Sequence, residues 1–158
     1  MEEAIASSIL EGAATTRKVA KEMLKKGRKP RNSSEQMVLN NYDAMNFILA
    51  HKDDPLTPAL ILEIHRQVTK GTIGKEAVGQ FRTSNDIVVA NPATRVIYHT
   101  PPDFRQIEPM IEAFCTFANE KDTADEPGRE YIHPVIKAII LHFLIGYIHP
   151  FEDGNGRT

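Results

Sequence analysis

The chain has 158 residues, of which 41% are hydrophobic and 25% are charged, proportions that are typical of one compact globular domain. Its formal net charge of -2 gives no electrostatic reason to expect binding of nucleic acid or of an anionic membrane surface. The single cysteine, Cys115, excludes an intrachain disulfide and fits a reducing, cytoplasmic location.

Helical periodicity dominates the first seventy residues and predicts helices over about 2–10, 15–26 and 33–51. The third helix is expected to begin near Ser33, where the run Ser33-Ser34-Glu35-Gln36 resembles a capping box. A fourth helix is expected to begin at Thr57-Pro58, since a capping residue followed by proline is typical of a helix start.

The pattern changes between Gly79 and Pro102, where β-branched residues alternate with turn-forming residues. This segment predicts a β-hairpin, with strands around residues 87–89 and 95–98, inserted into an otherwise helical protein. A helix over about 103–120 follows, which Pro109 should break or restart, and then a loop over 121–129.

The last predicted helix runs from His133-Pro134 to about Ile148. Its apolar segment, residues 135–148, contains a lysine and a histidine and is too short to span a bilayer core of about 30 Å. We therefore expect a buried helix of a soluble bundle. The acidic start of the chain lacks the basic region of a secretory signal, so no leader is expected either.

The last ten residues read His-Pro-Phe-Glu-Asp-Gly-Asn-Gly-Arg-Thr. Proline and glycines stop the preceding helix, so the segment should form a tight loop with a new helix starting between Gly154 and Gly156. Backbone N–H groups at a helix start bind anionic oxygens, and glycines allow phosphates to approach closely. His149 is suited to accepting a proton, Asp153 to holding Mg²⁺ and Arg157 to pairing with phosphate.

Two other interpretations of this loop remain open. Asp-Gly and Asn-Gly are common turn dipeptides, so the segment could be a plain surface turn. Asp-Gly-Asn-Gly also occurs in the calcium loops of EF-hands. In that register the first ligand position falls on Phe151, which has no side-chain oxygen, and the closing glutamate would lie beyond Thr158.

The whole string resembles the motif of the Fic family (filamentation induced by cAMP): His, any residue, Phe, any residue, Asp or Glu, Gly-Asn-Gly-Arg, two residues and a second Arg. Every position through Arg157 agrees, and the second arginine would fall two residues past Thr158. The segments Gly79-Gln80-Phe81-Arg82 and His99-Thr100-Pro101-Pro102, which flank the hairpin, also resemble the family.

The resemblance implies a mainly α, Fic-like helical bundle with an inserted β-hairpin flap. On this basis residues 13–158 are an incomplete Fic domain that lacks the C-terminal helices. It also implies a protein adenylyltransferase that moves AMP from ATP, with Mg²⁺, onto a Ser, Thr or Tyr hydroxyl of a partner protein. A homo-oligomer would be compatible with the resemblance.

Roles for individual residues follow from the same resemblance. His149 would be the general base, and Asp153 would hold Mg²⁺. The phosphates would lie on Gly154, Asn155, Gly156 and Arg157. The flap residues Val88, Val89, Val96 and Ile97 would pair with the target backbone by strand addition.

The N-terminus resembles the inhibitory helix of many Fic proteins, with Ser7, Glu11 and Gly12 in the matching positions. Residues 1–12 would then be an inhibitory helix. A carboxylate held at the phosphate site pairs with the arginines there and repels the γ-phosphate, so that ATP binds in a pose unfit for attack.

Because the second motif arginine is absent, we expect weak or no ATP binding and activity from this chain by itself. Some family members transfer other phosphate-containing groups or remove AMP, so these reactions are alternatives. A non-catalytic helical module that binds a protein through the hairpin edge is another.

Overall fold

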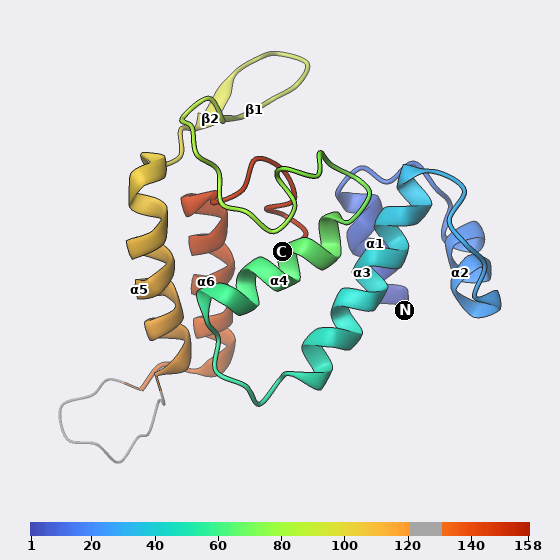
Figure 1. The fold of residues 1–158 in the computed structure, drawn as a ribbon, viewed down its shortest axis with the longest axis horizontal. Coiled ribbons are helices and arrows are strands. Elements are labelled where there is room, and N and C mark those ends of the chain that lie inside the picture. The colour runs from blue at the N-terminus through green and yellow to red at the C-terminus, as the bar shows by residue number, and fades with distance from the viewer. Residues whose placement is uncertain (121–130) are drawn as a thin grey trace.

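The computed structural model describes residues 1–120 and 131–158, so the loop predicted at 121–129 lies outside the described residues. The fold is mainly helical with one small antiparallel hairpin, as the sequence predicts (Figure 1). Its elements are α1 (Glu2–Leu10), α2 (Arg17–Lys26), α3 (Ser33–Ala50), α4 (Pro58–Thr69), β1 (Val89–Ala90), β2 (Ile97–His99), the 3₁₀ helix η1 (Phe104–Gln106), α5 (Ile107–Asn119) and α6 (Pro134–Ile148).

Local side chains set the helix starts. The Thr57 hydroxyl accepts a hydrogen bond from the Leu60 N–H, and Pro58 occupies the first helical position of α4, as expected. The cap of α3 is Asn32, whose side chain accepts from the Glu35 N–H at 2.9 Å. Helix α3 thus begins at Ser33, as expected, but the capping box does not form, because the Gln36 side chain that would close it donates to Asn40 Oδ1 instead.

The helix predicted over 103–120 is divided into η1 and α5. Pro109 lies in the first turn of α5, where its missing N–H is not required by the helix. Of the two expected effects of this proline, the restart of the helix is the one that the structure shows.

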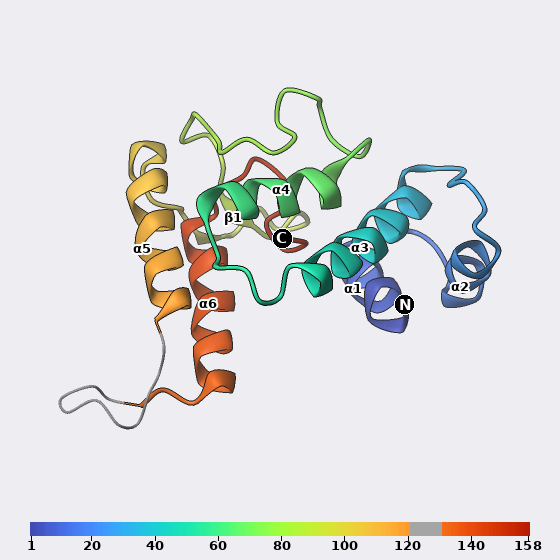
Figure 2. The ribbon, with the colours of Figure 1, turned by 60° about the horizontal axis from the view of Figure 1, so that its bottom comes forward.

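The helices form two packed groups that α4 joins. Helices α5 and α6 run antiparallel at one end, α4 crosses between them and α3, and α1 packs against α3 (Figures 1 and 2). The larger apolar cluster contains Ile61, Ile107, Ile111, Phe114, Cys115, Ile148 and Phe151. The smaller cluster contains Ile5, Ala20, Met23 and Val38.

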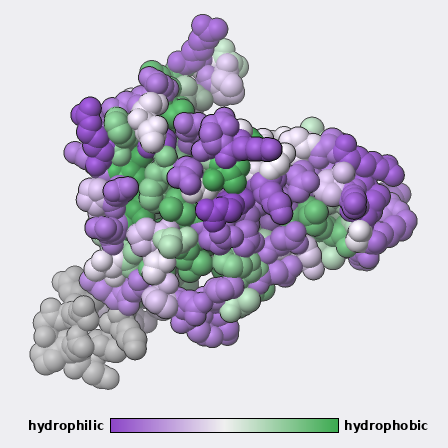
Figure 3. Space-filling view, in the orientation of Figure 1, coloured by the Kyte–Doolittle hydropathy of each residue, from purple (hydrophilic) through white to green (hydrophobic). Residues whose placement is uncertain are grey.

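Helix α6 is less buried than the sequence predicts. Its side chains Val135, Ile139 and Phe143 are 59%, 59% and 65% exposed, since within the described part of the chain only one side of the helix is covered. Hydrophobic residues gather on the half of the molecule built from α4, α5 and α6, and hydrophilic residues cover the half that contains α2 (Figure 3). Among the described residues, no helix combines the length and the hydropathy that a membrane span requires.

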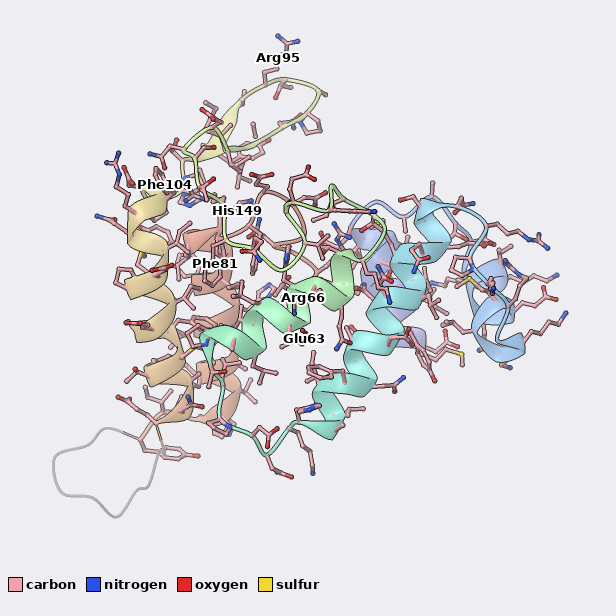
Figure 4. The ribbon with its side chains drawn as sticks, in the orientation of Figure 1. Glu63, Arg66, Phe81, Arg95, Phe104 and His149 are labelled. Carbon is pink, nitrogen blue, oxygen red and sulfur yellow. The ribbon has the colours of Figure 1, made fainter. Side chains whose placement is uncertain are left out.

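The hairpin is shorter than predicted. Val89 pairs with His99 and Ala90 pairs with Ile97, and the register is irregular between the two pairs. Arg95 closes the turn in a left-handed conformation, with a φ of 58°. The hairpin projects from the helices, and Arg95 points outward at its tip (Figure 4).

Candidate active site

His149 ends α6 in an uncommon backbone conformation. Its φ of 47° and ψ of 59° are left-handed, a region that costs a non-glycine residue roughly 1–2 kcal/mol. The following residue is Pro150, which also biases the residue before it towards extended conformations. The conformation is held from the hairpin side, because Arg82 donates from its Nε to the His149 carbonyl and from its backbone N–H to the Pro150 carbonyl, both at 2.9 Å.

The imidazole of His149 is half-buried, and burial lowers its pKa below the ordinary value of 6.5, while an interaction with the Gly146 carbonyl partly opposes this effect. The ring is therefore neutral near pH 7. A neutral imidazole can accept a proton, which is the property that the sequence predicts for this residue.

The motif loop is closed by Asn155. Its side-chain oxygen accepts from the Phe151 N–H at 2.9 Å, and its side-chain amide donates to the Phe151 carbonyl at 2.8 Å. Phe151 is fully buried in the larger apolar cluster. The Asn155 side chain thus shapes the loop from inside, so a ligand can meet only its backbone.

A helical turn begins at Gly154, within the range that the sequence predicts. The N–H groups of Arg157 and Thr158 both donate to the Gly154 carbonyl at 3.0 Å. Over residues 1–120 and 131–158, the backbone N–H groups of Asn155 and Gly156 donate no hydrogen bond. Two adjacent free donors at the positive end of a helical turn are suited to binding an anion.

The carboxylate of Glu11 lies against this turn. A Cβ atom built on Gly156 would collide with both Glu11 carboxylate oxygens, Oε2 lying 2.5 Å away. Within the described part of the chain, the Glu11 carboxylate has neither a hydrogen bond nor an ion pair. The structure therefore brings together Glu11 and the glycine turn, which lie near opposite ends of the sequence.

Helix α1 is held against α3 by Ser8, a residue for which the sequence predicts no role. Its hydroxyl donates to the Ala4 carbonyl at 2.7 Å and accepts from the Asn41 side chain at 2.9 Å. Ser7 lies one position away and is partly exposed, and Gly12 adopts a φ of 93° just after the helix. The buried serine is thus the one that positions the helix.

Arg157 and Asp153 are bonded to each other. The guanidinium donates to Asp153 Oδ1 at 2.9 Å, and also to the Val68 carbonyl and the Thr72 hydroxyl at 3.3 and 3.2 Å. The Arg157 side chain is only 5% exposed, whereas the Asp153 side chain is 64% exposed. Arg157 therefore faces Asp153 and α4 rather than Glu11.

His65 of α4 is a second residue of the site for which the sequence predicts no role. Its ring stacks on Phe151, with centroids 3.7 Å apart and planes 4° apart. Nδ1 accepts from the Gly79 N–H, so Nε2 carries the proton and donates to the Asp153 carbonyl, both at 2.9 Å. A polar residue on the buried face of α4 was the available signal.

The proposed flap residues lie on the hairpin as expected. Val88, Val96 and Ile97 are 42%, 54% and 56% exposed, and Val89 is partly buried. The hairpin is tied to α6 at its base by His99, whose Nε2 lies 2.7 Å from the Tyr147 carbonyl. The exposed edge is thus held near the end of α6 that carries His149 (Figure 4).

The sequence model of the Fic/DOC family matches residues 55–158. Two similar curated proteins are each called "Protein adenylyltransferase Fic". The protein from Nematostella vectensis is 35% identical over 114 residues, covering 72% of this chain and 23% of its own length. The protein from Aedes aegypti is 34% identical over 114 residues, covering 72% of this chain and 20% of its own length. The chain thus spans only a fifth to a quarter of these relatives.

Solved structures share the fold. A Fic-domain-containing signaling protein from Bacteroides thetaiotaomicron superposes with a TM-score of 0.78 at 24% identity, covering 96% of this chain and 55% of that one. Fic-1 (residues 134–508) from C. elegans gives a TM-score of 0.72 at 21% identity, covering 96% and 42%. With the family match and the geometry of the motif loop, these findings show that the chain belongs to the Fic/DOC family.

Proposed function

We propose that this protein is an adenylyltransferase that moves AMP from ATP to a Ser, Thr or Tyr hydroxyl of a partner protein, and that α1 inhibits it. The observation that carries the proposal is one arrangement: His149 ends α6, two free N–H groups open the following turn, and the Glu11 carboxylate lies on that turn. The curated relatives named as adenylyltransferases support the choice of AMP.

In the reaction, the target hydroxyl gives its proton to the neutral His149 imidazole while its oxygen attacks the α-phosphorus of ATP in line, and pyrophosphate leaves. The free N–H groups of Asn155 and Gly156 stabilise the negative phosphate oxygens. The flap residues Val96 and Ile97 align the target strand beside the base.

Asp153 is suited to hold Mg²⁺. Its side chain is mostly exposed, and Oδ2 takes no part in the bonds to Arg157 and Gly154. Mg²⁺ is usually held by one or two carboxylates together with water and substrate phosphates, so a single carboxylate beside the phosphate site is enough for this role. Bound there, Mg²⁺ would neutralise charge on the phosphates. Arg157 orients Asp153 by donating to its Oδ1. To contact a phosphate, Arg157 would either keep this bond and use another donor or give the bond up.

Inhibition follows from charge and space. The Glu11 carboxylate occupies the volume beside Gly156 that a phosphate needs to reach the two free N–H groups. The Glu11 carboxylate and a phosphate bound beside Gly156 would repel each other. The repulsion is stronger where little water separates the two charges. ATP therefore has to displace Glu11 or bind in a shifted pose. Because the carboxylate has no cation partner within the described residues, the contact is held by the placement of α1.

The test uses the protein as its gene encodes it, incubated with Mg²⁺ and ATP labelled at the α-phosphate, with and without a cell extract as the source of targets. Protein-bound label and released pyrophosphate are measured for the wild type, Glu11→Gly, His149→Ala, and the double variant. A matched control is Glu3→Gly, because Glu3 is an exposed glutamate of α1, the helix that Glu11 follows.

We expect label on protein to rise at least tenfold in Glu11→Gly, to stay unchanged in Glu3→Gly, and to vanish whenever His149 is replaced, since removing an essential base costs on the order of 100-fold or more. Equal label in all variants would refute the proposed function. Binding of a protein to the hairpin without any labelling would instead favour the non-catalytic module.

A further inference from the structure

The inference concerns Arg82, a buried cation at the base of the hairpin. Only 3% of the residue is exposed, and it lies in the segment that leads from α4 into the hairpin. A buried guanidinium is costly unless its donors are satisfied. Where those donors point therefore shows which parts of the fold depend on this residue.

The guanidinium bonds to three separate segments. Nε donates to the His149 carbonyl at 2.9 Å. One terminal nitrogen donates to the Ser84 carbonyl at 2.8 Å, at the first end of the hairpin, and the other donates to the Pro102 carbonyl at 2.6 Å, at its second end. One planar group thus joins both ends of the flap to the residue proposed as the base.

These acceptors are main-chain oxygens whose positions set the geometry of the site. The His149 carbonyl belongs to the residue in the left-handed conformation, and the backbone N–H of Arg82 holds the next carbonyl, that of Pro150, at 2.9 Å. Uncommon backbone conformations persist only where the surroundings fix them. Arg82 supplies two of these fixing contacts.

We propose that Arg82 is a positioning residue that couples the flap to the motif loop, so that a target strand docked on the flap presents its hydroxyl at a fixed place relative to His149. The role rests on the proposed transferase function for its consequence, although the coupling itself is a property of the fold. Arg82 touches no reacting atom. It acts through the main chain of His149, Ser84 and Pro102.

Lysine cannot replace arginine here. An ammonium is a point donor at the end of a flexible stem, whereas the guanidinium presents its donors in a rigid planar fork. Arg82→Lys keeps the positive charge but cannot reach carbonyls on three segments at once. Arg82→Gln removes the charge as well. Comparing the two separates the effect of the charge from the effect of the fork.

The test measures hydrogen exchange by mass spectrometry in peptides from the flap (84–102), the motif (149–158) and the N-terminal helices (2–50). We expect both Arg82 variants to speed exchange in the flap and in the motif together, by about tenfold or more, because several charge-assisted hydrogen bonds are lost. The N-terminal helices should stay unchanged. Arg105→Lys is the matched control, since Arg105 is a nearby arginine whose side chain is 78% exposed.

A second readout is AMP transfer in the Glu11→Gly background, with the dissociation constant of ATP measured by calorimetry. Transfer should fall on the order of 100-fold, the size expected when reacting groups are misplaced by about 1 Å. The dissociation constant of ATP should change less than about threefold, because the main-chain bonds of Arg82 go to Ser84, Pro102, His149 and Pro150 and not to the turn that begins at Gly154.

Three results would overturn the proposal: flap and motif exchange that stays at the wild-type rate, faster exchange in all peptides alike, or full recovery of protection by Arg82→Lys. If Arg82→Gln does not accumulate as a folded protein, Arg82→Lys carries the same comparison. Absence of transfer in Glu11→Gly with Arg82 intact would refute the proposed function only, since the exchange data still decide whether Arg82 couples the two segments.

Discussion

Replacing His65 by phenylalanine tests how the motif loop is held. The variant keeps a planar ring to stack on Phe151 but removes the acceptor for the Gly79 N–H and the donor to the Asp153 carbonyl. A buried polar group left without a partner costs about 1–3 kcal/mol, so two such groups give about 2–6 kcal/mol. We expect the lower half of this range, because Asp153 itself is largely exposed.

Urea denaturation followed by circular dichroism measures the difference in the free energy of unfolding. His51→Phe is the control, since among the described residues the side chain of His51 makes its one hydrogen bond to the Phe47 carbonyl of the preceding helix turn, and the change should cost less than about 1 kcal/mol. A loss for His65→Phe that is no larger than that of the control would refute the idea that His65 braces the loop.

The same variant should alter the dependence of stability on pH. Burial lowers the pKa of folded His65 below its ordinary value of 6.5. As the pH falls below 6.5, His65 is therefore protonated in the unfolded chain before it is protonated in the folded chain. Wild-type stability therefore decreases on acidification through this window. His65→Phe should show a shallower decrease, and an unchanged slope would contradict the assigned role of burial.

Three further outcomes are expected. The rate of AMP transfer should rise along an acidic limb with a midpoint below pH 6.5, because burial lowers the pKa of His149; a pH–rate profile with a higher midpoint is the contrary result. Glu35→Gln should lower the Tm at pH 7 and reduce the loss of stability between pH 4.5 and about 2, because the bond from Arg28 lowers the pKa of Glu35 to about 2 and its stabilisation is lost as the pH falls through that range. Thermal melts that show the same acid sensitivity in the variant and the wild type would contradict this role of Glu35. Ser8→Ala should raise protein labelling about fivefold, because it removes a hydrogen bond of about 1 kcal/mol between α1 and α3. Faster hydrogen exchange in α1 without increased labelling would show that α1 does not inhibit transfer.

The sequence predicts those parts of the fold whose signals are local. The start of α4 follows from Thr57-Pro58, and the end of α6 at Ile148 follows from Pro150, because each depends on neighbouring residues only. The turn that begins at Gly154 was also predicted from the proline and glycines around it. Capping and chain-breaking chemistry is readable without knowledge of the tertiary structure.

The supports of the site could not be predicted in this way. His65 contacts Asp153 across a separation of 88 residues, and Arg82 contacts His149 across 67. Nothing in the neighbourhood of either residue in the sequence indicates its partner.

The sequence also does not predict that one face of α6 is exposed. The apolar pattern of residues 135–148 correctly predicts a helix, but the expectation that this helix is buried is met on one side only, because the pattern cannot say what covers each side. In the described part of the chain, α5 and the motif loop cover one face, and Phe143 stays exposed on the other.

The position of Glu11 has a consequence for biosynthesis. Chains emerge from the ribosome from the N-terminus onward, so α1 and α3 can pack before residues 149–158 have been made. When the glycine turn finally forms against His65 and Arg82, the carboxylate on the completed α1 is already beside it. Under the inhibition proposed for α1, a newly made molecule would therefore be inhibited as soon as its motif loop folds.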